Sequence, residues 1–279
     1  EERAVKWSDT QIWEEITKRQ EEKAQKVDTF LRGFLPGIET VLTSGGTSPS
    51  DFTLHDAEHA FRVAKRMAEI VGDLLSELSI YELAFLLLSA YLHDIGMTPK
   101  ESKVNNHYKY LLTGDKEGIS NNEIEMLCQW LDDDERGISI PITSEAVTGK
   151  DIELANELVT HYCRHQHNEW SGEWIRKNRP DGDLGDYAGW DSDLIKLCQS
   201  HHYWMKELEG REFNPRIVGQ QGEVVHLRYL ACVLRIADIL DFDPGRTPDV
   251  ILRHRDIAQE SLIYWYKDHD ISFVKDKWI

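Results

Sequence analysis

Hydrophobic residues recur every three to four positions along most of the chain, which is the period of a helix with one buried face. The stretch from Ile80 to Leu92 is almost wholly apolar, so we expect that helix to be buried on all sides. Residues 98–120 and 178–189 carry no such period and are expected to be irregular. The spacing therefore predicts a mainly α-helical protein, with helices at about 8–32, 53–76, 80–92, 121–131, 151–177 (with a break near His165 left open), 191–208 and 223–240.

Two stretches of the chain depart from this pattern. Residues 42–50 are rich in Gly, Ser, Thr and Pro and predict a loop. The tail from Ser261 alternates apolar and polar residues in the manner of a β-hairpin. We therefore divide the chain into an N-terminal helical extension (1–50), a central helical domain (51–245) and a C-terminal segment (246–279). That last segment is a candidate for the start of a further domain.

Composition narrows the class of protein. The chain has 279 residues, of which 41% are hydrophobic and 29% charged, a balance typical of globular domains. The longest apolar run, Ala84 to Leu92, is too short to cross a bilayer, and no secretory signal opens the sequence. Four cysteines without CxxC spacing indicate reduced thiols. We expect a cytoplasmic protein without a membrane partner.

Several histidines and acids stand where helices rich in core residues end or pack. His93-Asp94 follows the buried apolar helix, and a carboxylate there is costly unless it is paired or metal-bound. His59 and Asp238 lie within other core helices. Three more histidines crowd one helix and two follow a short apolar helix. These five are His161, His165, His167, His201 and His202.

The donor types indicate which metals fit. Imidazole nitrogen and carboxylate oxygen with almost no thiolate suit Mn, Fe, Ni, Zn or Mg better than a structural zinc site. Two such ions about 4 Å apart can activate a water and neutralise charge on a phosphoryl group. The net charge of −18 disfavours a nucleic-acid surface, because phosphate backbones require clustered Lys and Arg.

The order of these residues resembles that of the HD superfamily of metal-dependent phosphohydrolases, over roughly residues 50–245. The match includes the flanking patterns HAFRV, LLLSAYLHDIGM and LRIADILD as well as the ligands themselves. The resemblance implies an HD-type helical bundle. It also implies that one metal is held by four side chains, namely His59, His93, Asp94 and Asp238.

The additional histidines resemble those of binuclear members of the superfamily, such as HD-GYP phosphodiesterases and the nuclease domain of CRISPR helicase-nucleases. This resemblance implies a second metal held by His167, His201 and His202, with His161 and His165 as competitors for the place of His167. Asp94 and His167 are the predicted catalytic residues. The role of His167 stays open between ligand and acid, because an H-x-x-x-S histidine aids catalysis in dNTP triphosphohydrolases.

Two departures restrict the activity. Met97 follows HDIG where HD-GYP enzymes have a catalytic Lys, and no GYP sequence occurs, so a cyclic-dinucleotide phosphodiesterase is disfavoured. The overall sequence most resembles the HD module of bacterial proteins that join it to an Hsp90-like ATPase. We therefore expect a fused or partner ATPase domain.

The resemblance implies an enzyme that hydrolyses a phosphoester of a nucleotide through a metal-activated water, with two divalent ions as cofactors rather than one. Lys100, Arg164 and Arg246 are candidate substrate contacts, and Arg235 is a further candidate for binding phosphate. Arg62 is expected to pair with an acid, and His107 to lie in a loop near substrate. Two alternatives stay open. One is a metal-dependent single-strand DNA nuclease, and the other is a non-catalytic nucleotide-sensing HD module.

Overall fold

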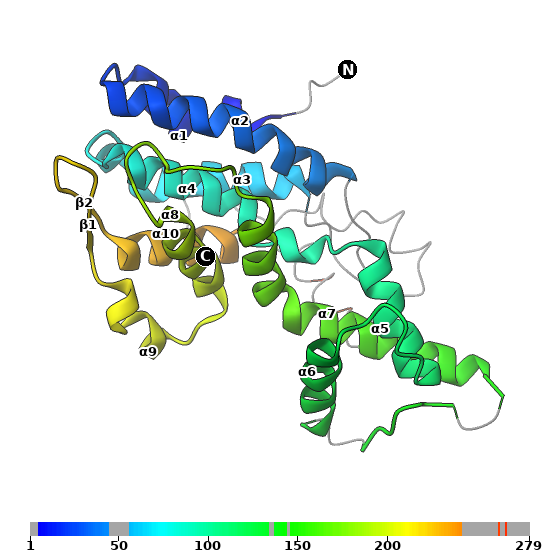
Figure 1. Cartoon of the computed structure of the whole chain (residues 1–279). Helices are drawn as coiled ribbons and strands as arrows, with labels where there is room; N and C mark the ends of the chain where they lie inside the picture. The colour runs from blue at the N-terminus through cyan, green and yellow to red at the C-terminus, as the bar shows by residue number, and fades with distance from the viewer. Residues whose placement is uncertain are drawn as a thin grey trace.

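The computed structural model describes residues 5–44, 56–133, 137–143 and 146–241, together with Leu262 and Tyr266. Over these ranges the chain is mainly α-helical, with a small two-stranded antiparallel sheet (Figure 1). The predicted fold class is therefore confirmed. Arg246 and most of the predicted hairpin-like tail lie outside the described residues. Within the tail, Leu262 and Tyr266 are described and are helical, so the hairpin prediction is wrong at these two positions.

The centre of the fold is helix α4 (Ile80–Leu92), in which every residue is buried. A capping box begins it: the Ser79 hydroxyl accepts from the Glu82 amide, and the Glu82 carboxylate accepts from the Ser79 amide at 2.8 Å. Because α4 is buried over its whole length and ends at Leu92, the next two residues, His93 and Asp94, lie at the edge of the core. Around it pack α1 (Gln11–Lys18), α2 (Glu22–Ser44), α3 (Ala57–Val71), α8 (Trp190–Gln199) and α10 (Leu227–Ile239).

These helices share one hydrophobic core. Each presents an apolar stripe to α4, and in Figure 1 the helices α1 and α2 cover one side of α3 and α4 while α8 and α10 lie on the other. Short 3-10 turns connect or precede them: η1 (Trp7–Asp9), η2 (Gly72–Ser76), η3 (Ile95–Met97), η4 (Ser200–His202) and η5 (Arg211–Phe213).

A second core forms an arm beside the main bundle. It is built from α5 (Glu101–Thr113), α6 (Asn121–Asp132) and the first half of α7 (Gly149–Asn178). Because α7 is 30 residues long, Leu158 and Tyr162 pack in this arm while Ile175 reaches the main core. The arm and the bundle are thus connected by one continuous helix, which Figure 1 shows running between them.

Several predicted boundaries are wrong. Residues 98–120 are not irregular: α5 occupies Glu101–Thr113, because Val104, His107 and Leu111 stand at helical spacing and pack inward. The helix predicted at 8–32 is two helices, with extended backbone at Arg19 between them, and α2 continues to Ser44. No break occurs in α7 near His165.

The last predicted helices also differ. Residues 191–208 form α8, η4 and α9 (Met205–Leu208) instead of one helix. The helix predicted from Glu223 begins at Leu227, because Glu223–Val225 is strand β2, paired with β1 (Arg216–Val218). Val224 and Val225 favour a strand, and Gly219 and Gly222 both adopt positive φ in the turn between the strands.

One stretch, Ile80–Thr113, is long and apolar enough to qualify as a membrane-spanning helix by length and composition alone. In the fold it comprises α4, η3 and α5, and 94% of its most apolar window is buried inside the protein. Burial in the core of the bundle therefore accounts for its apolar character.

Candidate metal centre

Four of the predicted ligands meet at the end of the central helix. His59 comes from the first turn of α3, His93 and Asp94 from the end of α4, and Asp238 from the last turn of α10. The His59 and His93 Nε2 atoms lie 3.4 Å apart, and they lie 3.6 Å and 3.4 Å from Asp94 Oδ2. Asp238 Oδ1 is 3.7 Å from His59 Nε2 and 3.6 Å from His93 Nε2. We call these four residues the first ligand group.

A second ligand group lies on the other side of Asp94. His167 comes from α7, and His201 and His202 come from η4. Both His167 Nε2 and His201 Nε2 lie 3.3 Å from Asp94 Oδ1 and 3.3 Å from each other. The two oxygens of Asp94 therefore face different histidine groups.

The distances fit metal binding. Ligands about 2.1 Å from a shared ion in tetrahedral arrangement lie about 3.4 Å apart, which is close to the separations of 3.3 to 3.7 Å between most of these atoms. The candidate ligand atoms of each group all lie within 4.8 Å of one another. The described residues thus contain two His/Asp groups that could each hold a metal ion.

The imidazole rings are held with Nε2 turned into the centre. The Nδ1 atom of His93 lies 3.2 Å and 3.1 Å from the carbonyls of Ser89 and Ala90, and that of His167 lies 2.6 Å from the Arg164 carbonyl. His201 Nδ1 lies 2.5 Å from the Cys198 carbonyl. A histidine that donates Nδ1–H to such an acceptor presents a lone pair at Nε2, the tautomer that a metal requires.

His59 is supported differently, by a buried carboxylate that the sequence interpretation missed. Asp241 Oδ2 accepts from His59 Nδ1 at 2.7 Å, and Asp241 Oδ1 accepts from Arg62 Nε at 2.9 Å. The expected pairing of Arg62 with an acid is thereby confirmed. Burial would raise the pKa of Asp241, but His59 and Arg62 lower it to about 2, so the carboxylate is ionised. The signal was available, since Asp241 lies three residues after Asp238 and is the last residue of the LRIADILD pattern, just beyond the end of α10.

The turn after the central helix is fastened to α7. Ser171 Oγ donates to the His93 carbonyl at 2.8 Å and accepts from the Gly96 amide at 2.9 Å. A Cβ at Gly96 would lie 2.0 Å from the His167 carbonyl oxygen, so only glycine allows this close approach. His167 and Ser171 lie one turn apart on α7, so the hydrogen bonds of Ser171 to His93 and Gly96 hold the second ligand group against the first.

Arg235 fastens the second group to α10. Its Nη1 donates to the Ser200 carbonyl at 3.0 Å and also to the Tyr203 carbonyl, on either side of the paired histidines. The sequence offers Arg235 as a candidate for binding phosphate, and in the structure its Nη1 is engaged with the backbone of the η4 turn.

The electrostatics of the centre favour a positive charge. Burial alone would lower the pKa of His93, but the carboxylates of Asp94 and Asp238 raise it well above its ordinary value. Burial would raise the pKa of Asp94, yet the surrounding histidines, His93 foremost, lower it well below the ordinary range. At His202, whose ring is partly desolvated although the residue as a whole is exposed, this desolvation together with His201 and His167 lowers the pKa to about 3. The ionised carboxylates and the neutral His202 are in the states that metal ligation requires.

The remaining candidates lie in varied surroundings. Of the three competing histidines on α7, only His167 joins the cluster, whereas His165 is exposed beside Trp130 and His161 is half-buried. His107 is not in a loop but buried in α5 against Tyr162 and Trp170.

Of the predicted substrate contacts, Arg164 is half-buried on α7, one turn before His167. Lys100 is exposed just after η3 and lines a small cavity there.

Comparison with known families agrees with this site. The family model named HD-CE matches residues 50–277, and the chain belongs to that family. The resemblance to HD proteins, inferred from the motifs, is thereby confirmed. Neither the curated proteins nor the solved structures gave a match to the chain.

Proposed function

We propose that the protein is a metal-dependent phosphohydrolase that cleaves a phosphoester of a nucleotide. The observation that carries the proposal is the position of Asp94, whose Oδ2 lies 3.4 Å from His93 Nε2 while its Oδ1 lies 3.3 Å from His167 Nε2. One carboxylate facing two ligand groups is the arrangement expected of a bridging ligand. The first group would hold one ion and the second group another.

Divalent ions held there would supply an activated water and neutralise charge on the phosphoryl oxygens. The chain's own part is to hold the ligands in place, through Asp241 for His59 and through Arg235 for the paired histidines. Asp94 fixes the spacing between the groups. The contacts of His167 to Asp94 and His201 favour a ligand role over that of a general acid.

The second group also supports a direction for substrate approach. His202 is exposed and His201 half-buried, whereas His59 and His93 are each only 1% exposed. A phosphoester therefore meets the second group first. The net charge of −18 favours a small nucleotide over a polynucleotide. The four free thiols favour an intracellular location.

The test pairs metal analysis with a hydrolysis screen. The chain, purified without chelator, should contain divalent metal and release product from nucleotide phosphoesters in added Mn²⁺. The His93→Ala/Asp94→Ala double variant should lose both properties, and His165→Ala, which alters an exposed histidine two residues from His167, should keep both. Phosphate release equal in the wild type and the double variant would refute catalysis and leave a nucleotide-sensing module.

A further inference from the structure

A small cavity lies directly beside the turn that carries the ligands. It has a volume of about 210 Å³ and is bounded by η3 and the start of α5 on one side and by the second half of α7 on the other. Ile95, the residue after Asp94, and Gly96 form part of its wall. The cavity therefore begins one residue beyond the predicted bridging ligand. None of the seven predicted ligands lines it.

The rim of this cavity is positively charged in an otherwise acidic protein. Lys100, Lys103 and Lys177 line it against one acid, Glu173. Lys103 is largely neutralised, because its Nζ lies 3.1 Å from Glu173 and 3.6 Å from Glu123. Lys100 and Lys177 are exposed and form no ion pair with another described residue. Two unneutralised ammonium groups at one rim favour an anionic ligand.

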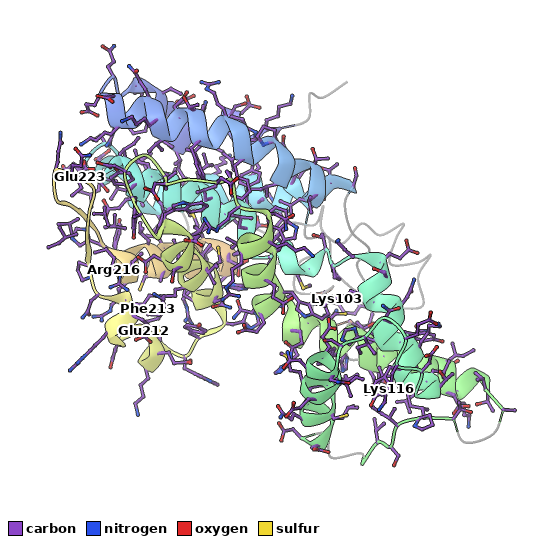
Figure 2. The ribbon with its side chains drawn as sticks, in the orientation of Figure 1. Lys103, Lys116, Glu212, Phe213, Arg216 and Glu223 are labelled. Carbon is purple, nitrogen blue, oxygen red and sulfur yellow. The ribbon has the colours of Figure 1, made fainter. Side chains whose placement is uncertain are left out.

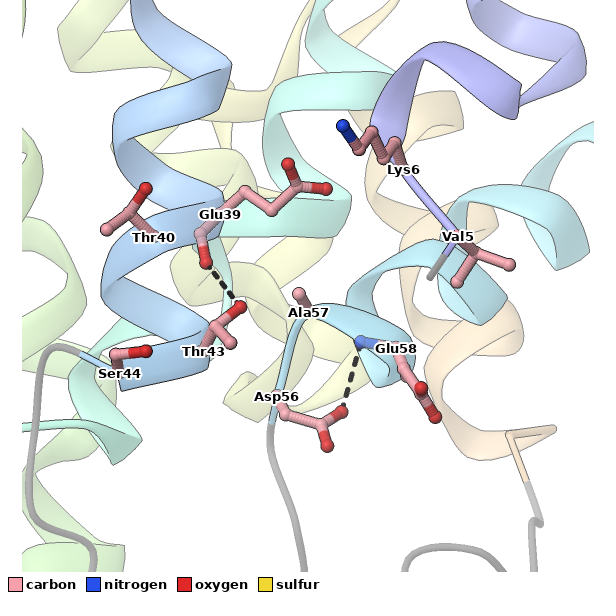
Figure 3. A pocket seen from close by; sticks show the side chains of 9 residues that line it. All are labelled: Val5, Lys6, Glu39, Thr40, Thr43, Ser44, Asp56, Ala57 and Glu58. Atoms are coloured by element: carbon pink, nitrogen blue, oxygen red, sulfur yellow. Dashed lines mark hydrogen bonds between the residues drawn. The ribbon is translucent and has the colours of Figure 1, made fainter. Parts of the chain in front are cut away.

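Another cavity shows the opposite charge. It has a volume of about 430 Å³, lies where α2 ends and α3 begins, and is lined by Glu39, Asp56 and Glu58 with Lys6 as its cation (Figure 3). That lining repels phosphate. The cationic cavity is therefore the better place for an anion.

The wall of the cationic cavity is aromatic and held firmly. Trp170 is 6% exposed, with Lys103 Nζ 4.3 Å from its ring centroid. Trp174 stacks on Phe34, with ring centroids 6.3 Å apart and an interplanar angle of 18°. An indole fixed in this way offers a flat surface to a planar ring at little entropic cost.

We propose that this cavity binds a nucleotide, with the base against Trp174 and a phosphate at Lys100 and Lys177. The volume is below the roughly 300–1,000 Å³ of sites that enclose a whole drug-sized ligand, so it has room for the base alone and leaves the phosphate at the rim. That the bound nucleotide is the substrate rests on the proposed function. Binding itself needs no metal.

The proposal is tested by calorimetry on the full chain in EDTA, with AMP, GMP, CMP and UMP as probes beside the free nucleosides and inorganic phosphate. At least one monophosphate should bind at least about tenfold more tightly than its nucleoside or phosphate alone, because only it makes both kinds of contact. The Lys100→Ala/Lys177→Ala variant should reduce that affinity to the level of the nucleoside. Trp174→Leu should reduce it toward that of phosphate.

Lys116→Ala is the matched control, because Lys116 is an exposed lysine outside the cavity, labelled in Figure 2 farther along the arm than Lys103. It should bind as the wild type does. The lysine variants alter exposed side chains, so loss of folding does not confuse the result, and thermal unfolding checks Trp174→Leu.

Two results would overturn the proposal: no binding of any monophosphate, or equal affinity in the lysine variant and the wild type. Failure of the proposed function looks different. If nucleotide binding depends on Lys100 and Lys177 but no nucleotide is hydrolysed in Mn²⁺, the cavity assignment holds and the proposed phosphohydrolase activity is refuted. Hydrolysis with unchanged affinity and KM in the lysine variant refutes only the cavity assignment.

Discussion

The two ligand groups on either side of Asp94 are built in different ways. His59 and His93 are 1% exposed, and Asp241, itself 3% exposed and paired with Arg62, orients His59. In the second group, burial decreases from His167 to the exposed His202. In that group, the Nδ1 atoms of His167 and His201 contact backbone carbonyls, those of Arg164 and Cys198, instead of a carboxylate.

This difference indicates different tasks. When a buried ligand set is oriented by a charged side chain, the free-energy cost of binding a metal is smaller, because its rings are already ordered and desolvated before the ion arrives. A set at the surface, carried by a short 3-10 turn, exchanges its ion more readily and meets the substrate. We therefore expect the first group to bind metal tightly and the second group to bind it more weakly.

The largest expected effect comes from the residue common to both groups. Asp94→Ala removes the carboxylate that faces His93 and His167, so both sites should lose affinity and hydrolysis should fall to background. Metal content after gel filtration and the rate of product release measure this. Asp183→Ala, an exposed acid on the loop before α8, is the control. One fully occupied metal site in Asp94→Ala would contradict the bridging assignment.

Single histidine variants should separate the two groups. His59→Ala should abolish the tight site, whereas His202→Ala should remove only the weak one, because the two residues belong to different ligand groups. Both variants should be inactive if the reaction needs two ions. Titration of Mn²⁺ into each chelated variant measures the remaining site. Equal loss of both sites in His202→Ala would refute the separation.

A smaller effect is expected at Asp241. Asp241→Asn removes the charge that orients His59 without changing the size of the side chain, and such changes weaken metal binding by roughly 10- to 100-fold. Only the tight site should respond. Asp193→Asn serves as the control, because Asp193 is a buried carboxylate that bonds Tyr187 and Arg216 instead. If the metal affinity of the tight site is unchanged in Asp241→Asn, then Asp241 does not have the proposed role of orienting His59.

The smallest effect is expected at Arg235. Arg235→Ala frees the η4 turn, so the weak site should lose a few-fold in affinity and the protein about 1–3 kcal/mol in stability. Arg228 provides a close comparison on the same helix, since it holds the carbonyls of Leu208 and Glu209. Arg228→Ala should cost similar stability in urea unfolding and leave both metal sites unchanged. Equal metal affinities in the two variants would mean that Arg235 serves folding alone.

The sequence was most informative where chemistry and helix periodicity coincide. His93-Asp94 could be located because a carboxylate at the end of an all-apolar helix needs a partner, and the helix is fully buried. It was less informative where a contact joins distant segments. Nothing in the local pattern around Ser171 or Arg235 indicates that they bond the backbones of His93 and Ser200.

Local patterns also failed where the buried stripe is short. The helix α5 was missed because its inward residues, among them His107 and Tyr110, are separated by polar ones that face solvent. It packs against α7, where the ring partners of His107, Tyr162 and Trp170, lie more than fifty residues further along the chain. The orientation of each imidazole likewise depends on which carbonyl its Nδ1 meets, and that is a property of the fold.

The most direct test is a calorimetric titration of Mn²⁺ into the chelated full chain, repeated with His202→Ala. The account predicts two ions per chain with unequal affinities in the wild type, and loss of only the weaker one in the variant. A single ion per chain in the wild type, or none, would contradict the two-group centre around Asp94.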